Sequence, residues 1–398
     1  MNLSNVFQSA AHKRLSSVEI PTLGSNQHEL NGVSALRHLF GTAVKIHGTI
    51  SWHYFADEVD PAEDDGQFTF YDARAKSADR TGRSEWRFYY NSAFLSCASV
   101  GDTLIVARTH TGQVFGLAFQ KDSAWLRAAR VLFGIEQSEP MFAEISQETL
   151  DAQQLELMRS QILIELNLEV ALPVAPADEE IMTEKFGTAF PTTREMSDFA
   201  RTRVEIGSCG PDEILVRWLE REEQLFRALE KVIIGTQITQ GFKDVDVFIE
   251  YSLSVQNRRK ARMGFALQNH LAALFTRNGL TYTAQARTEL NNRPDFIFPG
   301  EKEYHDEQFD DALLVMLGVK STSKDRWRQV LTEADRIPGK HLCTLEPSIS
   351  TRQTDEMRRH NLTLVVPEAL HETYSVTQRT ALLRVSDFID YVRRKQAA

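Results

Sequence analysis

One stretch of the sequence places an acidic residue and a lysine at the ends of two successive strand-like segments. Asp295 precedes the apolar run Phe296–Phe298, and Lys320 closes the apolar run 313–319. A carboxylate binds a hard cation through oxygen, and a lysine beside it can stabilise an attacking water or the charge of a phosphate. The pair is therefore typical of the site of a Mg²⁺-dependent nuclease.

The second carboxylate of such a site is absent from the lysine-bearing strand. It would normally stand two residues before the lysine, on the same side of the strand, and that position is Gly318. The apolar residues of 324–337 have helical spacing, and Glu333 follows Arg326 by about two turns. We expect Glu333 to supply the missing carboxylate from this helix. The alternative is that Asp295 caps a turn and the charges of the helix are solvated.

Ordered blocks around these residues resemble a known family. The resemblance covers about 186–373, and its blocks are Phe190-Pro191, Ser254–Lys260, Pro294–Phe296, Tyr304–Asp306, Val319-Lys320, Lys324–Gln329, Glu333–Asp335 and Leu364–Pro367. They resemble the EcoRII-type restriction endonucleases, a branch of the PD-(D/E)xK nuclease superfamily in which the second acidic residue has moved to the next helix.

The resemblance implies roles for five residues. Asp295 and Glu333 would be the Mg²⁺ ligands and Lys320 the catalytic lysine, while Tyr304 matches a family tyrosine near the site. The accessory helix carboxylate of the family falls on Gln268. An amide can bind a water of the metal shell but brings no charge. This departure keeps open a second hypothesis, a DNA-binding protein with a catalytically weak or inactive nuclease fold.

The resemblance and the charge pattern also indicate where duplex DNA would bind. Family members read C·G pairs with the segment that corresponds here to 324–326, and the chemistry fits, because Arg and Lys donate to guanine while Asp accepts from cytosine. The cations from Arg258 to Arg262 are expected to start a helix and contact phosphates, or else to form a solvated helix end. The expected DNA contacts of this half are Lys324, Asp325, Arg326, Arg328, Arg258, Arg259 and Lys260.

The N-terminal half has short strand-like segments, from about 28 to 143, broken by Gly and Asp. The acidic run 57–65 is expected to be a solvated turn. The blocks Gln27–Gly32 and Val100–Leu104 and the basic series 74–87 resemble, more weakly, the effector-binding domain of the same enzymes, a B3-like pseudobarrel. The basic series would line a DNA groove or form a solvated hairpin, and its candidate DNA contacts are Arg74, Arg80, Arg83 and Arg87.

Changes of pattern divide the chain into four expected parts. Residues 1–24 are polar and lack periodicity, as in an N-terminal arm, and 25–145 form the B3-like β-pseudobarrel. Residues 146–184 hold a helix and a Pro-rich acidic hinge. Residues 185–398 form the endonuclease domain, whose alternating strands and helices predict a restriction-endonuclease-like αβα core of the α+β or α/β class.

The overall composition excludes several classes of protein. With 398 residues, 42% apolar and 25% charged, the chain is not wholly disordered or collagenous. No apolar run approaches the ~20 residues of a membrane helix, so we expect a cytoplasmic protein without a membrane partner. The 3 cysteines are too far apart for a zinc ribbon or a disulfide framework. Because the net charge is −10, any DNA site must be a local basic patch.

These features together predict a Mg²⁺-dependent type II restriction endonuclease, of the kind that also binds an effector copy of its site. The resemblance favours a CCWGG or CCNGG-like sequence in double-stranded DNA, autoinhibition by the N-terminal domain, a homodimer formed through the C-terminal domain, and a cognate DNA methyltransferase encoded separately. A further alternative is a phage-defence nuclease that a ligand other than DNA activates.

Overall fold

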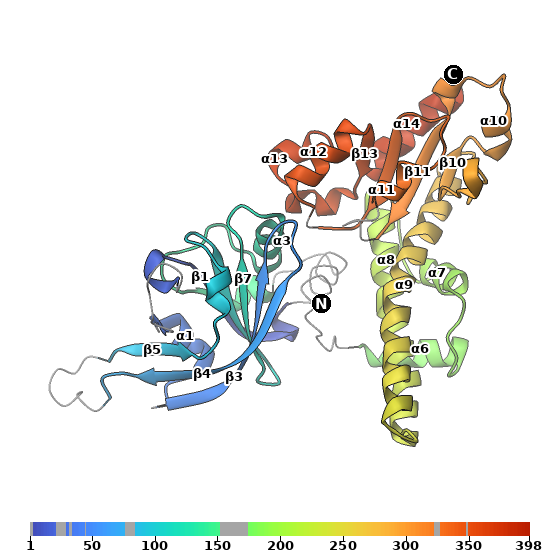
Figure 1. The fold of residues 1–398 in the computed structure, drawn as a ribbon. Coiled ribbons are helices and arrows are strands. Elements are labelled where there is room, and N and C mark those ends of the chain that lie inside the picture. The colour runs from blue at the N-terminus through green and yellow to red at the C-terminus, as the bar shows by residue number, and fades with distance from the viewer. Residues whose placement is uncertain are drawn as a thin grey trace. The chain divides into compact units, whose positions relative to one another are not determined.

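The computed structural model forms two compact units, residues 1–172 with 373–375 and residues 173–372 with 376–398. Each unit has its own sheet (Figure 1). In the described part of the chain, no helix combines the length and the apolar character that crossing a bilayer requires. The residues described are 3–20, 29–31, 34–43, 45–75, 84–151, 174–321, 327–347 and 349–398.

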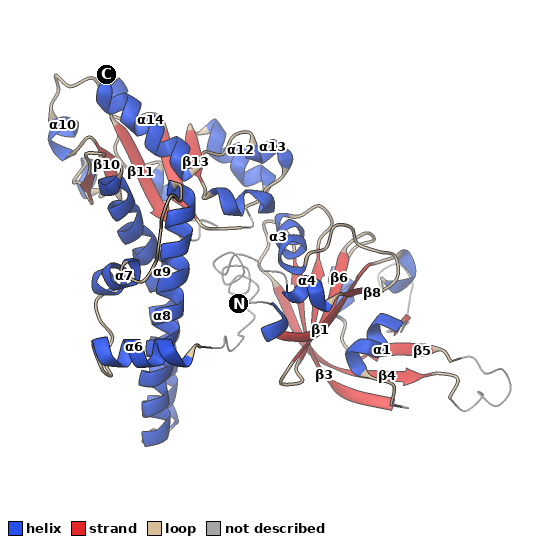
Figure 2. Ribbon diagram, turned by 180° about the vertical axis from the view of Figure 1, so that it is seen from behind, coloured by secondary structure: helices blue, strands red, loops and turns tan. Residues whose placement is uncertain are grey.

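The N-terminal unit contains a curled eight-stranded sheet (Figure 2). The strand order is β2-β5-β4-β3-β7-β6-β1-β8, and β3 and β7 are the parallel pair in an otherwise antiparallel sheet. Its strands are β1 (Phe7–Arg14), β2 (Glu29–Asn31), β3 (Lys45–Phe55), β4 (Ala62–Asp72), β5 (Trp86–Tyr90), β6 (Thr103–Thr109), β7 (Val114–Phe119) and β8 (Ala143–Ile145). Its helices are α1 (Ser34–Phe40), α3 (Ala124–Phe133) and α4 (Gln147–Asp151).

The concave side of this sheet buries aromatic rings that alternate along its long strands. Trp52, Phe68, Phe70 and Phe88 are at most 4% exposed and belong to one core cluster. The sheet is curled as a β-barrel fragment would be, but the closer B3-like assignment stays a prediction. The expected solvated turn at 57–65 is wrong in its second half, because β4 begins at Ala62 and carries Asp64 and Asp65 in register with β3.

The C-terminal unit contains a five-stranded mixed sheet in the order β13-β12-β11-β10-β9. β9, β10 and β11 pair antiparallel, whereas β11, β12 and β13 pair parallel. The strands are β9 (Thr283–Ala284), β10 (Phe296–Phe298), β11 (Val315–Lys320), β12 (Lys340–Thr344) and β13 (Leu362–Val365). The helices are α6 (Pro176–Phe186), α7 (Thr193–Arg201), α8 (Pro211–Gln240), α9 (Val245–Arg277), α10 (Glu301–His305), α11 (Trp327–Val330), α12 (Thr351–Arg359), α13 (Val376–Arg379) and α14 (Val385–Ala397).

Helices pack on both faces of this sheet. On one face, Phe275 of α9 and Phe388 of α14 pack on Phe298 of β10, with ring centroids 5.3 and 5.8 Å away. Side chains alternate across a strand, so the residues between these aromatics face the other way. On that opposite face α11 lies against Gly318 of β11, where a Cβ would be 2.9 Å from Val330. This arrangement agrees with the expected helix-sheet-helix core.

Two expectations about helices are wrong. The helix expected over 324–337 is present only as α11 in the described residues: it ends at Val330, and Ala334 has a φ of +53°, which an α-helix does not accommodate. Glu333 therefore lies in a bend after the helix. The cations from Arg258 to Arg262 do not start a helix, because α9 begins at Val245 and they lie within its middle.

Candidate active site

Asp295 lies in the bend that leads into β10 and is 6% exposed. Its Oδ1 accepts hydrogen bonds from the side-chain amides of Gln268 (2.6 Å) and Gln285 (2.8 Å), and its Oδ2 accepts one from the backbone N–H of Val319 (2.6 Å). Burial raises the pKa of Asp295, while the charge of Lys320 and these N–H groups oppose the rise. The carboxylate is thus buried and oriented by three N–H donors.

The pairing of β10 with β11 brings Lys320 to this carboxylate. Phe296 pairs with Leu317 in the antiparallel register, so the start of β10 lies beside the end of β11. Lys320 Nζ is 3.9 Å from Asp295 Oδ2. The structure therefore joins the two residues that the strand pattern singled out, in the arrangement expected for them.

Glu333 supplies the second carboxylate of the cluster. Burial, together with the charge of Asp295, raises the pKa of Glu333 to about 7, against the opposing charges of Lys320 and Lys340. Its Oε2 is buried and has no hydrogen-bond partner among the described residues. A buried carboxylate oxygen without a donor is costly, so this oxygen is available to a ligand.

The position of α11 explains why this carboxylate does not come from β11. A Cβ at Gly318 would stand 2.9 Å from Val330 Cγ2 and 3.1 Å from Val330 Cγ1, closer than side chains approach. No acidic side chain fits at Gly318 while α11 packs there. The packing of α11 on Gly318 therefore excludes a carboxylate at that position of β11. The chain that follows α11 forms the bend that carries Glu333, and Glu333 supplies a carboxylate instead.

The sequence of this unit matches a known domain. Residues 226–389 match the family model described as EcoRII C terminal. The chain is also 41% identical over 222 residues to the type II restriction enzyme EcoRII of Escherichia coli. The C-terminal unit is therefore similar in sequence to the EcoRII C-terminal family. The expected EcoRII-type resemblance is confirmed, and the C-terminal unit has the corresponding restriction-endonuclease-like fold.

The match to EcoRII covers 55% of this chain and 55% of that protein, so the chain spans about half the length of this relative. Two solved structures are similar in fold. One is a complex of restriction endonuclease PspGI with substrate DNA, which is 16% identical with a TM-score of 0.45 and covers 54% of this chain and 95% of that chain. The other is metal-depleted Ecl18kI in complex with uncleaved DNA, which is 18% identical with a TM-score of 0.45 and covers 56% of this chain and 86% of that chain.

Tyr304 lies on α10 and contacts, through Glu289, the chain after Glu333. Its hydroxyl donates to Glu289, at 2.7 Å from Oε1 and 2.6 Å from Oε2. Glu289 Oε2 in turn accepts the backbone N–H of Asp335 at 3.2 Å. The tyrosine is 1% exposed. It therefore helps to fix the turn that carries Glu333, and no hydrogen bond of the described residues joins it to Asp295.

Sequence reasoning missed three residues around the site. Gln285 has a φ of +54° and places its amide on Asp295. Glu289 connects Tyr304 to the turn, and Lys340 donates to backbone carbonyls of the same turn. Only Lys340 left a signal in the sequence, because it opens a strand-like segment, and a lysine is seldom buried in a strand. The other two contacts depend on turns whose geometry the sequence pattern does not specify.

The expected DNA contacts of this domain have different environments. Lys324, Asp325 and Arg326 lie outside the described residues, and so does the side chain of Lys260. Arg328 is half-exposed, with its guanidinium 4.6 Å from the Trp327 ring centroid and 2.9 Å from Glu356.

The two arginines of α9 that were expected to contact DNA, Arg258 and Arg259, are both engaged within the domain. Arg258 stacks on the Phe190 ring at 4.0 Å, and Arg259 forms an ion pair at 2.7 Å with the buried Glu230 of α8. A cation already balanced by a buried carboxylate contributes less to phosphate binding, so Arg259 is foremost a contact between α8 and α9.

The basic series of the N-terminal unit is partly paired. Arg80 and Arg83 lie outside the described residues. Arg74 forms an ion pair with Glu85 at 2.6 Å, and Arg87 contacts both Glu85 and Glu29. The described part of the series thus has its charge balanced by local carboxylates.

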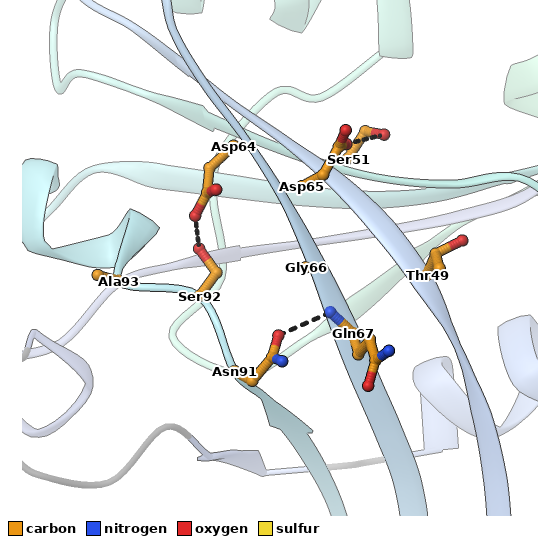
Figure 3. A pocket seen from close by; sticks show the side chains of 9 residues that line it. All are labelled: Thr49, Ser51, Asp64, Asp65, Gly66, Gln67, Asn91, Ser92 and Ala93. Atoms are coloured by element: carbon orange, nitrogen blue, oxygen red, sulfur yellow. Dashed lines mark hydrogen bonds between the residues drawn. The ribbon is translucent and has the colours of Figure 1, made fainter.

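The N-terminal unit also contains a polar cavity of about 680 Å³ at the edge of β4 (Figure 3). Asp65 accepts a hydrogen bond from Ser51 at 2.7 Å, and Asp64 accepts one from Ser92 at 2.5 Å. The residues that line it include neither lysine nor arginine; they are Thr49, Ser51, Asp64, Asp65, Gly66, Gln67, Asn91, Ser92 and Ala93.

The donor set of the C-terminal site fits a hard divalent cation. Among the described residues, no group of three or more His, Cys, Asp or Glu side chains is arranged to bind a metal. Mg²⁺ does not need one, since it is commonly held by one or two carboxylates and keeps several waters. Asp295 and Glu333 supply two carboxylates, and the buried Oε2 of Glu333 lacks a donor. The set is therefore suited to Mg²⁺ and unsuited to Zn²⁺, which prefers nitrogen and sulfur ligands.

Proposed function

We propose that the chain is a type II restriction endonuclease that hydrolyses phosphodiester bonds of double-stranded DNA with Mg²⁺ as cofactor. The observation that carries the proposal is the convergence of Asp295, Glu333 and Lys320 at one edge of the C-terminal sheet. This cluster lies within the residues that match the EcoRII C-terminal family model. The relative that supports the activity is named a type II restriction enzyme.

Each residue of the cluster has a distinct chemical task in this proposal. Asp295 and Glu333 would hold the cation, which supplies Lewis-acid stabilisation of the charge on the phosphate. Lys320 places an ammonium beside the scissile phosphate, where negative charge grows as the water attacks. Gln268 and Gln285 keep the Asp295 carboxylate oriented through their amide donors. Tyr304 acts through Glu289 on the turn that carries Glu333.

We further propose that recognition of a CCWGG or CCNGG-like site uses the segment 324–328, in which Arg and Lys donate to guanine and Asp accepts from cytosine. Support comes from its position immediately after the strand that carries Lys320. A protein that reads bases next to its catalytic lysine couples recognition to cutting. Arg328 stacks on Trp327 and would reach DNA from there.

A homodimer formed through the C-terminal unit is part of the proposal, since cutting both strands requires two active sites. The end of the α8/α9 hairpin exposes large apolar side chains that the described chain leaves uncovered, namely Ile238, Val245, Val247, Phe248, Ile249 and Leu253. Exposed apolar patches of this kind mark interaction surfaces. Phe248→Glu should produce monomers in light scattering, whereas Ser254→Glu on the same helix should not.

The N-terminal unit would act as an effector-binding domain that restrains cutting until a second DNA copy is bound. Arg74 and Arg87 form ion pairs with carboxylates of the same unit, so DNA binding by this unit requires a direct test. The full chain should cut plasmids with two sites faster than plasmids with one, because effector occupancy would favour the open state. If a nucleotide or a protein activates cutting and DNA does not, the effector role of the N-terminal unit is wrong. The alternative, a defence nuclease activated by a ligand other than DNA, then takes its place.

The experiment that tests the proposed function is digestion of plasmid DNA by the full chain in Mg²⁺, followed by sequencing of the ends. We expect discrete fragments with a common terminal sequence and no cutting in EDTA. The alternative function, a DNA-binding protein without activity, is favoured by the uncharged Gln268 beside Asp295. Gel shifts on a specific duplex without cleavage, in Mg²⁺ and in Mn²⁺, would support that alternative instead.

A further inference from the structure

Lys340 is a buried lysine at the start of β12, with 7% of its surface exposed. Its Nζ donates to three backbone carbonyls, those of Glu333 (2.6 Å), Ala334 (3.0 Å) and Ile337 (3.0 Å). An ammonium has three N–H donors, so its hydrogen-bonding capacity is used by one short segment. That segment begins with the residue that carries the second carboxylate of the site.

The chain after α11 creates the need for such a donor. The helix ends at Val330, and the positive φ of Ala334 turns the chain away from the helical path. A continuing helix would give its carbonyls backbone N–H donors. In this bend the carbonyl of Ala334 accepts the N–H of Ile337 at 3.0 Å, whereas those of Glu333 and Ile337 have no backbone N–H donor among the described residues. Buried carbonyls must be paired, and a compact ammonium on a flexible stem can bridge several at once.

Strand alternation places the Lys340 side chain on the face of the sheet that carries the bend with Glu333. His341 packs on Phe388 of α14, with ring centroids 5.2 Å apart, so its neighbour Lys340 faces the opposite side. β12 pairs in parallel with β11, where Leu317 lies beside His341. Lys340 therefore lies on the face of the sheet where α11 packs against Gly318, which is the face that carries the bend.

We propose that Lys340 is a positioning residue that fixes the non-helical turn of 331–337 and thereby aims the Glu333 carboxylate at the site of Asp295. The inference rests on the proposed function and deepens it. Lys340 does not touch the reacting atoms, and its effect passes through Glu333. The Glu289–Tyr304 pair holds the same turn at Asp335, whereas Lys340 bonds the carbonyl of Glu333 itself.

The test is a double-mutant cycle between Lys340→Met and Glu333→Gln. Methionine keeps an apolar stem but removes the three donors. Displacing a catalytic group by about 1 Å costs roughly 100-fold in rate, so we expect Lys340→Met to lower the single-turnover cleavage rate by about that factor. In the Glu333→Gln background the same change should cost less than about twofold, because its target is already lost.

Several readouts separate positioning from simple loss of structure. The single-turnover rate constant reports only folded molecules, whereas unfolding lowers the amplitude. Lys340→Met should also need a higher Mg²⁺ concentration for half-maximal thermal stabilisation of the full chain, while DNA binding in Ca²⁺ stays unchanged. Lys340→Arg, which keeps the charge and donors, should recover part of both effects. Lys395→Met is the matched control, since that half-buried lysine donates to a single carbonyl, that of Ala312, at 2.7 Å.

The inference is overturned if Lys340→Met cuts DNA at the wild-type rate, or if it slows the Glu333→Gln variant by the same factor as the wild type. Failure of the proposed function is a different result, in which the wild-type chain cuts no DNA at all. In that case the Mg²⁺-induced rise in melting temperature still tests Lys340. An equal rise in wild type and Lys340→Met would overturn the positioning role.

Discussion

Each unit of the molecule brings acidic side chains together, and the two clusters differ in how their oxygens are satisfied. In the N-terminal unit Asp64 and Asp65 are exposed, and each accepts a hydrogen bond from a serine hydroxyl. In the C-terminal unit Asp295 is buried among N–H donors, and the Oε2 of Glu333 is buried without one among the described residues. Only the second cluster contains a lysine beside its carboxylate.

This difference indicates that burial and missing donors, more than acidic composition, distinguish a site for a cation. A solvated carboxylate with a hydroxyl partner is already satisfied, so a cation gains little by binding there. A buried carboxylate that shares its site with another one favours whatever supplies positive charge. The comparison therefore predicts large effects from changes at the C-terminal cluster and small effects from changes at the N-terminal one.

The largest expected effect comes from Asp295→Ala. Removing the carboxylate that three N–H donors orient should lower the cleavage rate by at least about 1,000-fold, as losing a main catalytic group does. Binding of the same duplex in Ca²⁺, measured by gel shift, should persist, because the fold and the DNA-contacting residues remain. Cutting by this variant within tenfold of the wild-type rate would show that the active site lies elsewhere.

Glu333→Gln should have the next largest effect on cutting, about 100-fold or more, since the amide keeps the shape but brings no charge. Introducing an acid by Gly318→Glu in this background should not restore activity, because a side chain at Gly318 collides with Val330. Rates of plasmid nicking by the two variants measure both points. Recovery of activity in the double variant would mean that α11 moves away from β11.

A smaller effect of Glu333 is expected on the stability of the fold and on how that stability depends on pH. The pKa of Glu333 is about 7 in the folded chain against an ordinary value of 4.5, so the folded state binds a proton more tightly than the unfolded state. The stabilisation that comes from protonated Glu333 is fully present below about pH 4.5 and is lost as the pH rises to about 7. Above that pH, Glu333 causes no further change in stability.

Glu333→Gln should therefore raise the free energy of unfolding at pH 8 by about 3 kcal/mol and leave it nearly unchanged at pH 4. Urea unfolding at both pH values measures this difference. Mg²⁺ should stabilise the wild type at pH 8 more than the variant. Equal stability of the two chains at pH 8 would mean that the Glu333 carboxylate is solvated.

The smallest effect is expected from Asp65→Asn in the N-terminal cavity. Its carboxylate is exposed, and an asparagine oxygen can accept the same bond from Ser51. Cleavage should change by less than about twofold and stability by less than about 0.5 kcal/mol. A large loss of cutting by this exposed substitution would show that the N-terminal cavity is functional and would break the contrast between the two clusters.

The parts of the site that the sequence predicted are those that local patterns determine. The apolar runs of β10 and β11 identified two strands, and their order along the chain placed Asp295 near Lys320. The bend at Glu333 was not predictable, because the helical spacing of apolar residues continues past Val330, while Ala334 adopts a positive φ. That conformation depends on Lys340 and on the Tyr304–Glu289 pair, which reach it from other elements.

Charge patterns were the weaker guide. The basic run from Arg258 to Arg262 suggested a phosphate-binding helix start, but the run is central in α9, and Arg259 is paired with Glu230 of α8. The sequence shows the cations without showing which carboxylates face them across a helix pair.

The most direct test of the account is whether the Asp295 and Glu333 carboxylates hold a divalent cation. Lys320→Ala, which should not cut but keeps both carboxylates, can be mixed with duplex DNA and titrated with Mn²⁺ while free Mn²⁺ is followed by electron paramagnetic resonance. We predict that this variant binds Mn²⁺ with at least tenfold higher affinity than the same variant with Asp295→Asn and Glu333→Gln added. Equal Mn²⁺ binding by the two proteins would contradict the assignment of the site.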